Sequence, residues 1–156
     1  MENNSIDTDA IYAAGLMDAD GTYIIFFSKH PNGVRGGHFR AEAGLQIREK
    51  FICDWMKSTF GGSVTLIRSK NPKHSDIYHW KATGKYIEDF LRRVYPYAKI
   101  KHAQIRHLLD FRDIRKGYNS STVTEEQWRQ MLVLKDSITT LNMKGNGRGT
   151  TPSTVR

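Results

Sequence analysis

Residues 13–21 read AAGLMDADG, and this short stretch says most about the fold. Its small residues are typical of a closely packed helix, and Gly21 is a helix stop signal that follows two carboxylates, Asp18 and Asp20. The C-terminal end of a helix carries partial negative charge, so carboxylates there are disfavoured unless a cation offsets them. The sequence therefore predicts a helix whose acidic end lies next to a cation.

The hydrophobic pattern of the whole chain predicts the order helix, strand, strand twice in succession, followed by further helices. Two such units can form one four-stranded antiparallel sheet with helices on one face, which leaves the other face open for a ligand. We therefore predict an α+β fold with an αββαββ core and C-terminal helices. The expected elements are a helix from Asp7 or Thr8 through Met17, strands at 22–27 and 39–48, a helix at 50–60, strands at 63–68 and 77–83, helices at 85–94 and 98–116, and a last helix that begins at a capping box, 124–127.

Length and composition favour one domain with a polyanionic partner. The chain has 156 residues, a net charge of +8 and a pI near 9.7, so we expect nucleic acid as the partner ahead of an anionic membrane surface. We expect one domain over residues 1–144 and a flexible tail over 145–156. The apolar runs are too short for a membrane span, and the N-terminus lacks a signal-peptide pattern, so we expect an unsecreted protein. The single cysteine, Cys53, excludes an intrachain disulfide and is expected to fill the core.

One face of the predicted sheet is polar, because apolar and polar side chains alternate over residues 39–48. Arg and Gln on that face suit base edges in the major groove, and lysines in the adjoining loops suit phosphates. The alternative is a solvated face without a ligand. Glu42 favours it because a carboxylate would repel phosphate, although Glu42 could also accept from a cytosine amino group. The predicted DNA contacts are Lys29, Arg35, His38, Arg40, Glu42, Gln46, Arg48, Arg68, Lys70, Lys73, His79 and Lys81.

The orientation of the strand at 63–68 is left open by its sequence. The phase that turns Val64 and Leu66 toward the core also turns Arg68 inward, unless a bulge or the end of the strand intervenes.

Residues 13–21 closely resemble the LAGLIDADG signature of homing endonucleases, with seven of nine positions matched and apolar replacements at Ala13 and Met17. The likeness extends over about residues 8–142. It implies an αββαββ unit whose saddle-shaped sheet straddles double-stranded DNA. Because this chain has one signature, the resemblance also implies a homodimer in which two signature helices pack together. The alternative is an ordinary helix packed within its own domain. The predicted interface residues are Ile11, Ala14, Gly15 and Asp18.

The resemblance also implies the nature of the cation at the helix end. Asp20 corresponds to the family's acidic metal ligand, with the Ala19 carbonyl as a second ligand. Mg²⁺ is the expected cofactor, Mn²⁺ can substitute, and no small-molecule cofactor is expected. Each chain supplies one such carboxylate, so dimerisation supplies the other. Asp18 is expected to support the motif through a local turn hydrogen bond rather than to bind metal.

A second match lies at residues 95–104, YPYAKIKHAQ, which resembles the family's proline-aromatic-x-lysine-x-lysine segment followed by Gln. It implies that Lys101 reaches the active site and that Lys99 faces a phosphate. Both could instead be surface lysines at a helix start, where the dipole disfavours positive charge. Glu49 is a catalytic candidate that would order the attacking water, or it merely starts a helix. Gln104 belongs either to the core or to the active site.

These residues predict a homodimeric, metal-dependent DNA endonuclease that binds a long pseudo-palindromic site and makes a double-strand break. The resemblance further implies short 3′ overhangs, a mobile intron or intein as genetic home, and an organelle or prokaryotic cytoplasm as location. The alternatives are a non-cleaving DNA-binding regulator of the same fold and an RNA-binding intron maturase. An RNA-binding protein would be expected to expose aromatic side chains on the sheet face.

Overall fold

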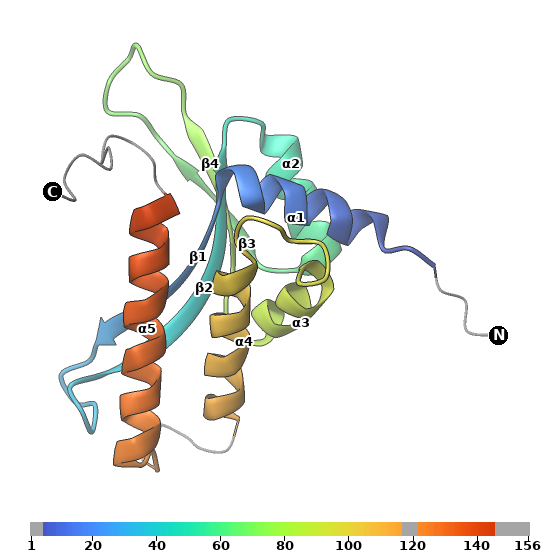
Figure 1. Ribbon diagram of the computed structural model, residues 1–156. Coiled ribbons are helices and arrows are strands. Elements are labelled where there is room, and N and C mark those ends of the chain that lie inside the picture. The colour runs from blue at the N-terminus through green and yellow to red at the C-terminus, as the bar shows by residue number, and fades with distance from the viewer. Residues whose placement is uncertain (1–4, 117–121, 146–156) are drawn as a thin grey trace, which may run out of the picture.

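The chain folds as two helix-strand-strand units followed by three helices, as the computed structural model shows for residues 5–116 and 122–145 (Figure 1). The α+β class and the αββαββ order are confirmed. The elements are α1 (Thr8–Asp20), β1 (Gly21–Lys29), β2 (Gly37–Ile47), α2 (Lys50–Phe60), β3 (Ser63–Ile67), β4 (Ile77–Ala82), α3 (Lys85–Val94), α4 (His102–Arg115) and α5 (Glu125–Gly145).

The four strands form one antiparallel sheet in the order β1-β2-β4-β3, with β2 and β4 in the middle. Gly21 pairs with Leu45, so the C-terminal end of α1 lies at the end of the sheet where β2 finishes. Side chains that alternate along the strands face either the helices or the opposite, uncovered side, which we call the open face.

A single core lies between the sheet and the helices. It includes side chains such as Tyr23, Leu45 and Trp80 from the strands together with buried residues of all five helices. The Trp80 indole donates to the Gly61 carbonyl at 2.9 Å, so this large buried side chain has a polar partner. Cys53 is fully buried in this core, as predicted.

Two helix boundaries depart from the sequence-based predictions, and one helix cap is confirmed. Helix α1 continues to Asp20, one turn beyond Met17, and the Gly21 N–H closes it on the Met17 carbonyl. Helix α4 begins at His102 rather than at residue 98, because the preceding N–H groups bind a side chain from α1. The capping box is confirmed: Thr124 and Gln127 exchange hydrogen bonds of 2.9 and 3.2 Å between side chain and backbone.

The orientation of β3 is resolved by the strand's end. Val64 pairs with Trp80 and Leu66 pairs with Tyr78, so Val64 and Leu66 share the core-facing side of the sheet. The strand ends at Ile67, so Arg68 lies beyond it and is exposed.

Among the described residues, no helix is both long and apolar enough to cross a bilayer. The predicted tail, apart from Gly145 at the end of α5, lies outside the described residues.

Candidate nucleic-acid interface and active site

The acidic end of α1 is held by the turn that precedes α4. One oxygen of the Asp18 carboxylate accepts from the backbone N–H groups of Lys99 at 2.8 Å and Ile100 at 3.1 Å. The other oxygen accepts from the N–H of Lys101 at 3.0 Å. These donors lie at the N-terminal end of α4, where the helix dipole is positive and favours an anion. Asp18 therefore supports the motif as predicted, but through contacts more than 80 residues away rather than through a local turn.

The side chain of Lys101 supplies an intramolecular cation at the same place. Its Nζ donates to the Met17 carbonyl at 2.8 Å and to the Gly21 carbonyl, both at the C-terminal end of α1. Burial lowers the pKa of the Lys101 ammonium, while the charges of Asp18 and Asp20 act in the opposite direction. A helix C-terminus that binds a lysine ammonium is electrostatically favourable. Within one chain, Lys101 therefore places a cation at the acidic end of α1, and the Mg²⁺ that the resemblance implies there stays a prediction.

Asp20 differs from Asp18 in having no hydrogen bond or ion pair with the described part of the chain. It is exposed in the last turn of α1, as is Ala19, and the last carbonyls of a helix lack intrahelical partners. A carboxylate and backbone carbonyls are the hard oxygen ligands that Mg²⁺ prefers. The described residues of one chain hold no group of three His, Cys, Asp or Glu side chains fit for a metal. The donors therefore suit a divalent ion but give only part of a ligand set.

A cavity of about 470 Å³ adjoins this end of the helix. The structure brings three predicted site residues, Asp18, Ala19 and Lys101, together in its wall. Gln104 is buried and lines the same cavity. Glu49 lies outside this wall: it is the exposed N-cap of α2 and makes no side-chain capping hydrogen bond.

Two features of this region have no local signal in the sequence. Asn142 of α5 lines the cavity and donates from Nδ2 to the Tyr23 carbonyl at 2.9 Å. The Tyr23 hydroxyl is buried without a hydrogen-bond partner in the described part of the chain, and burial followed by the Asp18 charge raises its pKa strongly. Tyr23 on β1 and Asn142 on α5 are far apart in the sequence, and they meet only in the folded chain.

The outward stripe of α1 consists of Ile11, Tyr12, Gly15 and Ala19, all exposed. A Cβ added at Gly15 would meet no atom of this chain within 4 Å, so the helix backbone is open to close approach there. Two of the four predicted interface residues turn elsewhere. Ala14 is 1% exposed because it shares the inward stripe with Ala13 and Met17, and Asp18 binds the turn before α4. Ile11 and Gly15 remain on the outward stripe.

The open face carries the predicted polar residues of β2 and β4 side by side. Gln46 pairs with His79, Gly44 with Lys81, and Glu42 and Arg40 follow along β2. The Lys81 Nζ lies 3.8 Å from a Glu42 oxygen, which offsets the negative charge that favoured a ligand-free face. Burial lowers the pKa of His79, with a further contribution from Lys81. His79 lies over Gly44, where an added Cβ would come within 2.9 Å of its Nε2.

The remaining predicted DNA contacts divide into free and paired side chains. Arg35 turns toward α5, where it contacts Glu125 at 2.9 Å and lies over the Trp128 ring, so it is already paired within the chain. Arg40 lies over Phe26, the one phenylalanine, tyrosine or tryptophan on the open face within the described residues. His38 is half-buried on β2. The exposed members of the set are Lys29, Arg40, Gln46, Arg48, Arg68, Lys70, Lys73 and Lys99.

Comparison with solved structures identifies the fold. No family model matches the sequence, and no curated protein sequence matches it. The chain is similar in structure to the homing endonuclease I-CvuI in complex with its target, with 19% identity, a TM-score of 0.71, and coverage of 95% of this chain and 90% of that one. It is also similar to the archaeal intron-encoded homing endonuclease I-Vdi141I complexed with DNA, with 13% identity, a TM-score of 0.71 and the same coverage. The I-LtrWI LAGLIDADG homing endonuclease bound to target DNA matches at 19% identity and a TM-score of 0.64, and this chain spans 50% of its length. The chain has the fold of the LAGLIDADG homing endonucleases.

Proposed function

We propose that this chain is a site-specific DNA endonuclease that works as a homodimer and cuts both strands of a long, pseudo-palindromic duplex. The observation that carries the proposal is the state of the two carboxylates at the end of α1. Asp18 is fully engaged by backbone N–H groups, whereas Asp20 is exposed and unpaired within the described residues, beside a basic open face. The solved structures with this fold that were compared above are homing endonucleases, several of them bound to DNA.

The outward stripe of α1 supports a dimer. Ile11 is 42% exposed and Tyr12 is 52% exposed, an unusual amount of apolar surface on a helix whose opposite side is fully buried. Gly15 lies next to them and allows two helix backbones to approach closely. A second copy packed on this stripe brings a second Asp20 to the same region. The partial ligand set of one chain then becomes a set with two carboxylates.

Asp20 and the Ala19 carbonyl would hold Mg²⁺, with Mn²⁺ as a substitute, and the ion would lower the pKa of attacking water and stabilise the leaving oxygen. Lys101 contributes positive charge beside Asp20, where it stabilises the negative charge that develops on the phosphorus centre. Glu49 follows the end of β2, which pairs with the start of β1, so it lies at the same end of the sheet as Asp20. We assign it the ordering of water near the scissile phosphate.

The open face supports duplex binding. Arg40 and Gln46 are exposed on β2, and both residue types pair with base edges in the major groove. The Glu42–Lys81 pair removes the repulsion that an isolated carboxylate would cause. Exposed lysines in the adjoining loops suit backbone phosphates, so duplex affinity is expected to fall steeply with salt.

The test is cleavage of a plasmid library of randomised sites, with sequencing of the ends produced. We expect double-strand breaks with short 3′ overhangs in Mg²⁺ and binding without cleavage in Ca²⁺. Asp20→Asn should bind the selected site but not cut it, whereas Asp9→Asn, the same charge change at an exposed position of the same helix, should cut normally. Normal cleavage by Asp20→Asn would remove the active-site assignment. Binding without cleavage by the native chain in Mg²⁺ would favour the non-cleaving regulator, and preference for single-stranded RNA would favour the maturase.

A further inference from the structure

The basic surface extends from the open face around one edge of the sheet. At this edge, which we call the free edge, part of β2 is paired on one side only. Strand β2 pairs with β1 from Gly37 to Leu45 but with β4 only from Ala43 to Ile47. Strand β4 ends at Ala82, so within residues 5–116 and 122–145 no strand lies beside residues 37–42 of β2 on that side. The open face and the helix layer therefore meet around this edge.

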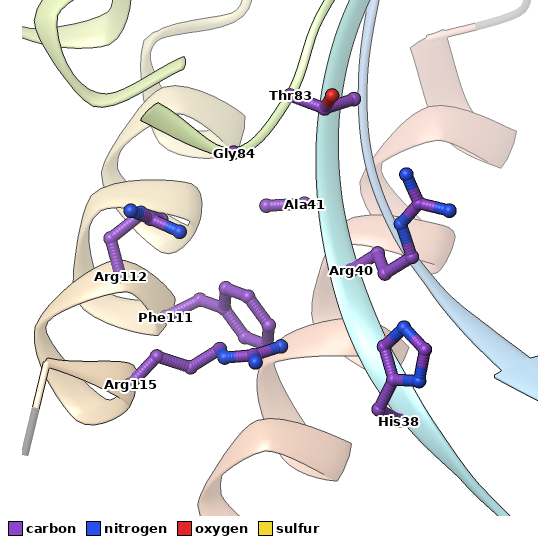
Figure 2. A pocket seen from close by; sticks show the side chains of 8 residues that line it. All are labelled: His38, Arg40, Ala41, Thr83, Gly84, Phe111, Arg112 and Arg115. Carbon is purple, nitrogen blue, oxygen red and sulfur yellow. The ribbon is translucent and has the colours of Figure 1, made fainter. Parts of the chain in front are cut away.

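A cavity of about 240 Å³ lies at the free edge, between β2 and α4 (Figure 2). His38 and Arg40 project from β2 on its side away from α4, whereas Arg115 extends from α4 toward the strand and Arg112 lies beside the helix. Thr83 and the glycine that follows it close the cavity at the end of β4. We call this cavity the edge pocket.

The charges that line the edge pocket are all of one sign. None of its lining residues is acidic. Its basic side chains are His38 and Arg40 from β2 and Arg112 and Arg115 from α4. The Arg112 Nε is buried and has no hydrogen-bond partner among the described residues. Its nearest ion pair is with Glu88, at 3.9 Å, and Glu88 is also contacted by Arg92 and Lys116. A buried guanidinium donor without an acceptor indicates a position for an acceptor from outside the chain.

The titration of His38 agrees with an excess of positive charge at this edge. Burial is the first cause that lowers the pKa of His38, and the charges of Arg115, Arg40 and His30 lower it further. No acidic group among the described residues contributes a compensating effect on His38. An anion bound in the edge pocket would relieve this repulsion.

We propose that the edge pocket binds a phosphate group, and that this phosphate belongs to the backbone of a bound duplex. Arginine guanidiniums match the geometry of phosphate oxygens and form charge-assisted hydrogen bonds with them. His38 and Arg40 belong to both the open face and the edge pocket, so a duplex on the open face places backbone at this edge. Helix α4 thereby becomes part of the DNA-contacting surface, which the sequence did not predict. The backbone source of the phosphate rests on the proposed function.

Arg115 has a structural task that the test must avoid. Its Nη1 donates to the Phe39 carbonyl on β2, so its removal would disturb the strand itself. Arg112 makes no such bond, and Arg112→Gln removes one charge while it keeps the shape of the wall. Arg129→Gln on α5 is the matched control, because Arg129 is an exposed helix arginine with one ion pair, to Glu126 at 3.2 Å.

The experiment has two arms. The first titrates inorganic phosphate while the imidazole NMR signals of His38 are followed, and the second measures the salt dependence of binding to a mixed-sequence duplex. We expect saturable phosphate shifts in the native chain and in Arg129→Gln, and roughly tenfold weaker phosphate binding in Arg112→Gln. In the duplex arm, the slope of log K against log salt should become less steep by about 0.9 in Arg112→Gln but not in Arg129→Gln.

Each other outcome overturns part or all of the proposal. Phosphate shifts that are absent in the native chain refute the edge pocket as an anion site. Phosphate binding with an unchanged duplex slope in Arg112→Gln refutes the backbone as the source and points to a free phosphate ligand. Failure of the native chain to bind any duplex refutes the proposed function, while the phosphate arm still decides whether the pocket binds an anion.

Discussion

The two carboxylates at the end of α1 differ in their contacts, and this difference predicts unequal effects of the same substitution on the free energy of unfolding. In Asp18→Asn, one of the two carboxylate oxygens becomes an NH₂ group, which cannot accept from a backbone N–H. At least one of the bonds to Lys99, Ile100 and Lys101 is therefore lost, and the others lose their charge assistance.

The magnitude follows from these contacts. Loss of one hydrogen bond to a charged group costs about 1.5–3 kcal/mol, and loss of the anion at the N-terminal end of α4 costs about 0.3–1 kcal/mol. Removal of a negative charge from the C-terminal end of α1 returns a similar small amount. We expect Asp18→Asn to lower the free energy of unfolding by about 2 kcal/mol, which corresponds to a fall in Tm of roughly 4–8 °C for a domain of this size.

Asp20→Asn is the matched comparison, two residues away on the same helix turn. Because Asp20 has no partner in the described part of the chain, its free energy of unfolding should change by less than about 0.5 kcal/mol. Guanidinium chloride unfolding followed by circular dichroism measures both variants under one set of conditions. Equal stability of Asp18→Asn and the native chain, or equal losses in the two variants, would refute the division of tasks between the carboxylates.

Three further predictions test other contacts. Asp7 and Arg93 form a bidentate pair at 2.9 and 3.2 Å, which lowers the pKa of the Asp7 carboxyl below its ordinary value of 3.8. The stabilisation that this pair contributes is therefore complete above that pH and is lost as the pH falls through the folded-state pKa. Arg93→Gln should therefore lower the free energy of unfolding by about 1 kcal/mol at pH 7, allowing for solvent screening. Urea unfolding should show that the difference from the native chain becomes smaller below about pH 4, and a difference that becomes larger there would contradict this prediction. Because the Lys101 ammonium donates to two carbonyls at the end of α1, although its burial offsets part of this gain, Lys101→Met should lower the free energy of unfolding by about 1–3 kcal/mol. It should also slow cleavage by about a hundredfold or more, and single-turnover rates that stay native would contradict this role. Gly44→Val should displace His79 from the open face and weaken duplex binding in a filter or fluorescence assay while the far-ultraviolet circular dichroism stays native; unchanged affinity would remove this part of the face from the interface.

The order of elements was predictable because helices and strands leave a local periodicity in the sequence. The alternation over residues 39–48 placed Arg40 and Gln46 on one face of the sheet, and the structure has them there. Glycine and the capping box marked helix boundaries correctly, since caps act within a few residues.

The contacts that define the site could not be predicted in the same way, because they join distant parts of the chain. Asp18 was expected to bond within its own turn, but its donors lie more than 80 residues away and carry no local signal. Arg35 belongs to a basic loop by sequence, yet the packing of α5 beside it provides Glu125 and Trp128 as partners. The spacing of α1 residues placed Ala14 with Ile11 and Gly15 on the predicted interface face, and only the packed core shows that Ala14 turns inward.

The central claim is that two copies meet along the outward stripe of α1 and so bring two Asp20 carboxylates together. Sedimentation equilibrium of the native chain and of Ile11→Glu tests it most directly, because the substitution places a charge in the proposed contact without touching the core. We predict a species of twice the 17.9 kDa chain mass for the native protein at micromolar concentration, and a folded monomer for Ile11→Glu. A native chain that sediments as a monomer of 17.9 kDa would contradict the claim.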